Sequence, residues 1–234
     1  MSSDALQQLE EELSGLSKGL LPSDYEQNAS SYDENDWKEK VKGYIVLSHA
    51  AFENYLEQLA IELLKKAYRL FQTTKQPNNV LVSLVLSYRI HWPPVDTTCN
   101  ECFWKKHIIH CIGKRSSFQK LKPNAKSFDK IIHEVIYDYF IKDVIQENHG
   151  TRVKHIDALF TPLGFNINLL NITFSIDIEN FCSTRGIIAH TTTTSKITNI
   201  LSPNNAKNYV EKLFGGKPGV WGFTEFDSLV MSLL

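Results

Sequence analysis

Arg185 and His190 are the two residues whose types and spacing point most directly to chemistry, and they bracket the short segment Gly186-Ile187-Ile188-Ala189. Arginine is always charged, and its planar guanidinium binds phosphate through several N–H donors. Histidine exchanges protons near neutral pH. Together they could cleave a phosphodiester bond without a metal ion, because one group would hold the phosphate while the other moves a proton.

The spacing of this pair admits two interpretations. Five residues on an ideal α-helix correspond to a rotation of about 140°, so Arg185 and His190 do not share a face of one helix. A long arginine side chain or a fraying helix end would bring them together, and a two-fold dimer would bring two such pairs into one cleft. The alternative is a surface arginine in an ion pair and a histidine near a helix C-terminus, where its positive form is favoured.

Two other segments extend the pattern. Residues 47–56 read Leu-Ser-His-Ala-Ala-Phe-Glu-Asn-Tyr-Leu, and residues 178–190 read Ile-Glu-Asn-Phe-Cys-Ser-Thr-Arg-Gly-Ile-Ile-Ala-His. Together with residues 155–165, they resemble the HEPN superfamily, and most nearly its RiboL-PSP-type branch. In that branch an early long helix carries an ALE-x-Y/F-L motif and a late helix carries an RN-x-IAH motif. The resemblance covers about residues 36–71 and 150–195.

This resemblance implies an all-α, HEPN-like helical bundle that acts as a metal-independent endoribonuclease, with RNA as substrate and no cofactor. The product would be a 2′,3′-cyclic phosphate. By the same resemblance, Arg185 would hold the scissile phosphate, His190 would act as general acid or base, and Glu53 would orient one of them. Such domains typically form homodimers with the active site at the interface. They often serve as toxins or abortive-infection (antiviral) effectors, with an antitoxin or a sensor protein as partner.

Gly186 departs from this family pattern, in which asparagine usually follows the arginine. Glycine removes that polar side chain and loosens the helix. The alternative function is therefore a catalytically silent HEPN module that binds a nucleotide or a partner protein. Gly186 and Thr191, which directly follows His190, are secondary candidates for the site.

His49 and Glu57 are further secondary candidates. They lie four residues before and four residues after Glu53, so the three side chains share one face of the expected early helix. This face either points into the same cleft as the Arg–His pair or forms a solvated polar stripe opposite the apolar side of the helix.

A cysteine- and histidine-rich segment has the chemistry of a metal site. Cys99 and Cys102 have the C-x2-C spacing of half a zinc site. The other weak candidates follow closely, and they are His107, His110 and Cys111. Their spacing matches no familiar zinc finger, so we favour reduced thiols and histidines in a short helix and expect no bound metal.

Charge is distributed unevenly along the chain. The net charge is only −1, but residues 1–36 carry nine acidic residues against Lys18 alone, whereas residues 105–130 carry eight basic residues against Asp129 alone. Lysines neutralise phosphates and interleaved aromatic rings can stack on unpaired bases, although a charge run is more often a solvated face. The candidate RNA-binding residues are Lys105, Lys106, Lys114, Arg115, Lys120 and Lys122.

Composition predicts a packed soluble domain over residues 1–234, because 42% of the residues are hydrophobic and 22% are charged. No segment approaches the roughly 18 to 20 apolar residues of a membrane span, and the polar N-terminus does not resemble a secretory signal. Four cysteines are too few for a disulfide scaffold, so we expect a cytoplasmic protein without membrane contact.

Apolar periodicity places the candidate residues on a helical bundle with an irregular basic insertion at 75–126, between the long helices. An acidic N-terminal helix and linker are expected over 1–35, and a long helix from about Asp36 to Phe71. Residues 80–90 are either a short buried helix or a strand. Further helices are expected over 127–146, 151–161, 176–190, 205–213 and 224–234.

Overall fold

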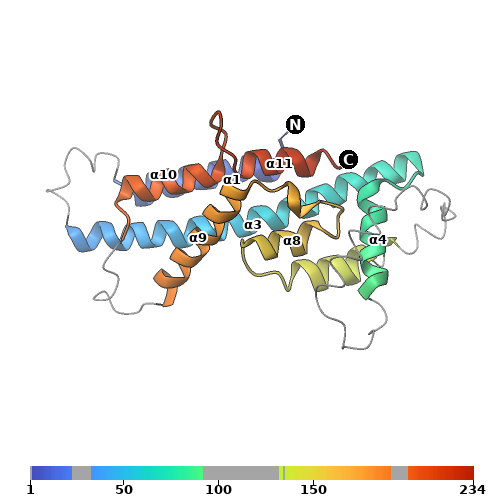
Figure 1. Ribbon diagram of the computed structural model, residues 1–234, viewed down its shortest axis with the longest axis horizontal. Coiled ribbons are helices and arrows are strands. Elements are labelled where there is room, and N and C mark those ends of the chain that lie inside the picture. The colour runs from blue at the N-terminus through green and yellow to red at the C-terminus, as the bar shows by residue number, and fades with distance from the viewer. Residues whose placement is uncertain (1, 23–32, 92–131, 134, 191–199) are drawn as a thin grey trace.

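The chain folds as an all-α bundle around one long helix (Figure 1). The computed structural model describes residues 2–22, 33–91, 132–133, 135–190 and 200–234, and these contain helices and no strand. In chain order the helices are α1 (Asp4–Leu20), α3 (Glu34–Thr74), α4 (Asn79–His91), the π-helix η2 (Val135–Ile145), α8 (Val153–Phe160), the 3-10 helix η3 (Ile167–Leu169), α9 (Ile172–His190), α10 (Pro203–Phe214) and α11 (Phe223–Met231).

Helix α3 is the axis of the bundle. Its 41 residues extend about 60 Å at the ordinary helical rise. The helix begins at Glu34, two residues before the expected start near Asp36. Its N-cap is Asp33, whose side chain accepts a hydrogen bond from the backbone N–H of Asn35 at 2.8 Å. The helix ends at Lys75, which adopts a left-handed conformation with φ of 56°. Helices α1, α4, α8, α9, α10 and α11 all contact α3, so α3 determines where their side chains meet.

An aromatic core joins α3 to the C-terminal helices. The ring of Phe52 lies 5.7 Å from that of Phe181 on α9 and 4.8 Å from that of Phe223 on α11, between centroids. Phe223 in turn contacts Phe174 at 5.1 Å. All four rings are buried, and aromatic pairs of this kind stabilise a core beyond the area they bury. This packing fixes the rotation of α9 relative to α3.

Two expected elements, residues 80–90 and residues 176–190, are both helices in the structure. Residues 80–90 lie in α4, so the buried-helix interpretation of this segment is correct. Helix α9 begins at Ile172, four residues earlier than expected. The side chain of Asn171 explains the earlier start, because its Oδ1 accepts hydrogen bonds from the backbone N–H groups of Thr173 at 2.8 Å and Phe174 at 3.3 Å.

The helix expected over 127–146 is described in part, and residues 135–145 within it form a π-helix instead of an α-helix. Its last turn keeps the wider pattern, since the Gln146 N–H donates to the Ile141 carbonyl, five residues back, at 3.2 Å. The basic, irregular part of the insertion expected at 95–126 lies outside the described residues. Among the helices that are described, none combines the length and the apolar character that a membrane span requires.

The two ends of the described chain are joined by a buried carboxylate. Asp227 of α11 is fully buried and accepts hydrogen bonds from the Ser3 backbone N–H at 3.0 Å, from the Ser3 hydroxyl and from the Tyr55 hydroxyl at 3.3 Å. Burial raises the pKa of Asp227, although the hydrogen bonds from Ser3 and Tyr55 oppose that effect. The network holds α1 and α11 together on α3.

Removing this carboxylate is expected to destabilise the bundle. Asp227→Ala leaves the backbone N–H and hydroxyl of Ser3 without their buried acceptor, while Tyr55 retains only the Phe223 carbonyl. The free energy of unfolding should therefore fall by about 2 kcal/mol. Urea denaturation followed by circular dichroism measures the change. The control is Ser228→Ala, because Ser228 is an exposed neighbour and its loss should cost less than about 0.5 kcal/mol. Equal midpoints for the two variants would contradict the assigned role of Asp227.

Candidate functional site

The Arg185 guanidinium is partly buried and lacks a carboxylate partner in the described part of the chain. Its Nε atom is buried and has no hydrogen-bond partner among the described residues, and no ion pair within them involves the side chain. Arg185 lies close enough to His49 of α3 for its charge to lower the pKa of that histidine. A partly buried arginine without a carboxylate is an electrostatic cost that an anion would relieve.

His49 is the buried centre of the surrounding polar residues, with 6% of its surface exposed. Its Nε2 atom lies 3.1 Å from the Thr151 hydroxyl and 3.7 Å from the Cys182 sulfur. Its Nδ1 atom lies 4.0 Å from Glu53 Oε2, and its ring stacks on Phe181 with 6.3 Å between centroids. One imidazole therefore links α3, the segment before α8 and α9.

Burial is the main reason that the pKa of His49 falls from 6.5 to about 4, and the positive charges of Arg185, His155 and Arg152 lower it further. The ring is therefore neutral at neutral pH, so it adds no positive charge next to Arg185. A solvated polar stripe, the alternative for this face, is wrong for His49. Glu57 is half-buried, and its pKa is raised by burial and by Glu53.

A tight turn before α8 brings Thr151 to His49. Gly150 has φ of 141°, a conformation that favours glycine. A Cβ atom at this position would lie 2.5 Å from two ring atoms of His155, so the close packing of this ring also requires glycine. The backbone N–H of Arg152 donates to His155 Nδ1 at 3.2 Å. The Thr151 hydroxyl then contacts both His49 and, at 3.0 Å, the Cys182 sulfur.

A second arginine, Arg152, follows this turn at the N-terminus of α8 and reaches across to α9. Its Nη1 atom pairs with Glu179 Oε2 at 2.5 Å, and its Nη2 atom lies 3.4 Å from the Ser183 hydroxyl. The other oxygen of Glu179 accepts the backbone N–H of Val153 at 3.0 Å. Both charged side chains are 38% exposed, so this ion pair is open to solvent.

We refer to these residues as the polar junction, and its members are His49, Glu53, Thr151, Arg152, His155, Glu179, Cys182 and Arg185. They come from three elements that contact one another, namely α3, α8 with its preceding turn, and α9 (Figure 1).

The sequence candidates are only partly brought together. Glu53 contacts His49 Nδ1, and the charge of Arg185 lowers the pKa of the same histidine. His190 ends α9, but its side chain lies outside the described residues. Gly186 lies in α9, and a Cβ atom there would meet nothing within 4 Å among the residues that the structure describes. The described residues therefore do not block a Cβ atom at this position.

The remaining candidates lie outside the described residues. These are Thr191, the weak metal candidates Cys99, Cys102, His107, His110 and Cys111, and the RNA-binding candidates Lys105, Lys106, Lys114, Arg115, Lys120 and Lys122. Among the residues that are described, no group of three or more His, Cys, Asp or Glu side chains is arranged to hold a metal ion.

A family model described as RiboL-PSP-HEPN matches residues 4–215. The chain belongs to the RiboL-PSP-HEPN family. The match begins with α1 and runs through α10, so the polar junction lies entirely within the RiboL-PSP-HEPN domain. The family connects this domain with nuclease-related, RNA-related or nucleotide-binding modules, and HEPN domains are often ribonucleases. Comparisons with curated proteins and with solved structures gave no match.

Five members of the junction of this RiboL-PSP-HEPN domain were not singled out as site residues from the sequence. They are Thr151, Arg152, His155, Glu179 and Cys182. The usable local signal was the glycine at position 150 before two polar residues, which is typical of a turn. The contact of Thr151 with His49 joins positions 102 residues apart, and no spacing rule reports such a pair.

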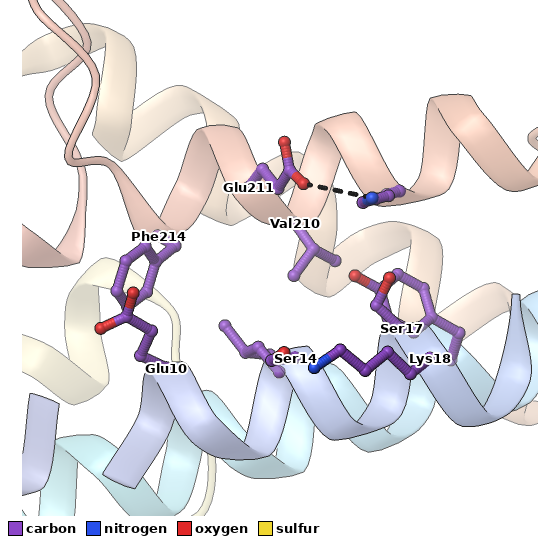
Figure 2. Close-up of a pocket in the computed structure, with 10 residues that line it drawn as sticks. Glu10, Ser14, Ser17, Lys18, Val210, Glu211 and Phe214 are labelled. Atoms are coloured by element: carbon purple, nitrogen blue, oxygen red, sulfur yellow. Dashed lines mark ion pairs between the residues drawn. The ribbon is translucent and has the colours of Figure 1, made fainter. Parts of the chain in front are cut away.

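A groove of about 290 Å³ lies elsewhere, between α1, α3 and α10. Figure 2 shows Ser14 and Lys18 of α1 on one side of it and Val210 and Glu211 of α10 on the other. Glu211 also pairs with Lys207 at 3.8 Å. No member of the polar junction lines this groove, so we do not assign the chemistry of Arg185 to it.

The buried His49 predicts a pH-dependent stability. Because its pKa is about 4 in the folded protein, against an ordinary value of 6.5 for an exposed histidine, the unfolded chain binds a proton first as the pH falls. The free energy of unfolding should therefore be intact above about pH 6.5, decrease between about pH 6.5 and 4, and lose about 3 kcal/mol in total from this group.

Urea unfolding at several pH values between 7 and 4 measures this effect. His49→Gln retains a polar side chain but cannot titrate. The free energy of unfolding of this variant should therefore decrease less between about pH 6.5 and 4 than that of the wild type. His155, whose pKa is also lowered by burial, contributes equally in both proteins and cancels in the difference. Parallel profiles for the wild type and the variant would contradict a neutral, buried His49.

Proposed function

We propose that this protein is a metal-independent endoribonuclease that leaves a 2′,3′-cyclic phosphate. The observation that carries the proposal is the Arg185 guanidinium, whose buried Nε atom has no partner among the described residues and which lies beside a neutral histidine. Such a group suits an anionic ligand, because the phosphate supplies the missing charge and hydrogen-bond acceptors. Membership of the RiboL-PSP-HEPN family makes RNA the natural source of that phosphate.

In this proposal the RNA 2′-hydroxyl attacks the adjacent phosphorus, and the bond from phosphorus to the 5′-oxygen breaks. Arg185 holds the phosphate and stabilises the charge that develops on its oxygens. His190 acts as general base toward the 2′-hydroxyl or as general acid toward the leaving 5′-oxygen. Glu53 acts through His49, which it faces at 4.0 Å, and so helps to orient the junction around Arg185.

We further propose that the active protein is a homodimer. Large apolar side chains are exposed at the start of α9 and just before it, with Leu169 at 56%, Ile172 at 73% and Ile176 at 54%. Ile172 and Ile176 are four residues apart on α9 and therefore share one face. A second copy of this chain would bury them together with Leu169, which ends the 3-10 helix η3 just before α9. A role as a toxin or antiviral effector, controlled by an antitoxin or sensor protein in the cytoplasm, fits this activity.

The second candidate function is a catalytically silent module that binds a nucleotide or a partner protein. Gly186 favours it, because the asparagine typical of the family is missing although the described residues would not block a Cβ atom there. The same Arg185 would then bind a phosphate without cleavage.

Cleavage of total RNA in the presence of EDTA distinguishes the two functions. We expect the wild type to cleave and to leave 2′,3′-cyclic phosphate ends. Arg185→Ala and His190→Ala should each lower the rate by about 100-fold or more. Arg69→Ala is the matched control, because Arg69 is an exposed arginine of α3 and its loss should leave the rate unchanged. Equal cleavage by all four proteins would overturn the assignment, and no cleavage by a folded, dimeric wild type would favour the silent module.

The proposed dimer is tested by Ile176→Glu. A charge placed in the apolar stripe of α9 should weaken self-association by about tenfold or more, because an unpaired carboxylate would be buried at the interface. Light scattering after size-exclusion chromatography measures the change in mass over a concentration series. The control is Leu70→Glu, the same kind of change at an exposed leucine of α3. A monomeric wild type, or a dimer unaffected by Ile176→Glu, would contradict this interface.

A further inference from the structure

Arg152 provides a second guanidinium group near the proposed phosphate site, because its charge and that of Arg185 both act on His49. Glu179, Cys182 and Arg185 follow one another at intervals of three residues along α9, so each is adjacent to the next in an inclined row that turns about 120° around the helix from Glu179 to Arg185. Arg152 is bound to the first member of this row, at 2.5 Å, and Arg185 is the last member. The two guanidinium groups therefore attach to the row at points about 9 Å apart along the helix axis.

We propose that Arg152 binds a phosphate neighbouring the one held by Arg185, and that Arg152 forms its ion pair with Glu179 when no RNA is bound. This inference rests on the proposed function, because it assumes that Arg185 binds RNA phosphate. It adds Arg152 as a second contact to the nucleic-acid backbone. It also assigns Glu179 as a carboxylate that competes with RNA for Arg152.

The backbone around Arg152 is built to hold the side chain in this place. The Gly150 turn, the hydrogen bond from the Arg152 N–H to His155 and the contacts of Thr151 with His49 and Cys182 all fix the segment. Only the end of the Arg152 side chain is free to change partners, and 38% of that side chain is exposed. An arginine anchored in this way presents its planar fork to an incoming oxyanion at little entropic cost.

Glu179 can release Arg152 without leaving its own position. One carboxylate oxygen accepts the Val153 N–H at 3.0 Å while the other binds the guanidinium. Ion pairs that are partly exposed add little to stability, so exchange of the carboxylate for a phosphate is inexpensive. Glu179 then remains nearby as a negative charge that opposes phosphate binding. Neutralising it should strengthen RNA binding, whereas removing Arg152 should weaken it.

The test measures binding of a fluorescent single-stranded 2′-O-methyl RNA, which cannot be cleaved because it lacks the 2′-hydroxyl nucleophile. Anisotropy is recorded with the full chain at several salt concentrations. Glu179→Gln keeps the size of the side chain and its bond to Val153, and it should tighten binding by about threefold or more. Arg152→Ala should weaken binding by about tenfold and reduce the salt slope by about 0.7, the value for one lost phosphate contact on a single strand. Arg152→Lys should recover part of the affinity.

The matched controls come from an ion pair between α9 and α10, in which Lys212 Nζ lies 2.7 Å from Asp177 Oδ2. Asp177→Asn and Lys212→Ala change the net charge in the same way as the two test variants but away from the junction, so both should bind RNA as the wild type does. A gain of affinity in Glu179→Gln cannot result from misfolding. If Glu179→Gln binds no tighter than Asp177→Asn, or if Arg152→Ala leaves the salt slope unchanged, the inference is overturned.

Arg185→Ala separates this inference from the proposed function. If Arg185→Ala weakens binding while the Arg152 and Glu179 variants bind as the wild type does, the second phosphate contact is wrong and the proposed function stands. If Arg185→Ala binds RNA as the wild type does, the proposed function fails, and the inference fails with it. Weakened binding in both arginine variants, with tighter binding in Glu179→Gln, supports both.

Discussion

The burial of His49 in a helical core is the constraint around which the site is arranged. A buried imidazole needs polar partners, since an unpaired one would lose its hydrogen bonds to water. Thr151 supplies the nearest partner, at 3.1 Å, and it reaches the ring because Gly150 turns the chain tightly before α8. The Cys182 sulfur of α9 is a second polar partner, 3.7 Å from His49 Nε2. Through Thr151 and Cys182, the His49 ring thus fixes the positions of α3, the turn before α8 and α9 relative to one another.

The two arginines of the polar junction differ in their ion pairing. Arg152 has its carboxylate, Glu179, in an ion pair that is partly exposed. Arg185 has a buried Nε atom without a partner in the described part of the chain. His49, held neutral by burial and by the neighbouring positive charges, does not add to their repulsion. A site whose cation has no ion pair among the described residues, and whose nearby histidine is uncharged, is suited to take up an anion.

The proposed nuclease and the proposed silent module share this anion site, and they differ in whether a proton can be moved once the phosphate is bound. Gly186 bears on that difference, because it provides no polar side chain at the position where the family usually has asparagine, although the described residues would not block a Cβ atom there. Family membership supports RNA-directed or nucleotide-directed function in both cases. In the proposed reaction this proton is moved by His190, whose side chain lies outside the described residues.

The sequence by itself determined the elements and the residue types of this protein. Helical periodicity predicted the long α3, and the motifs around Glu53 and Arg185 predicted the family, because both signals are local in the chain. It left the type of residues 80–90 open and set the start of α9 too late. Only the tertiary structure decided that His49 is buried and that Thr151 and Cys182 are its partners, 102 and 133 residues away. Side chains so distant in sequence meet only after α9 has packed its aromatic face against α3, and no local pattern encodes that packing.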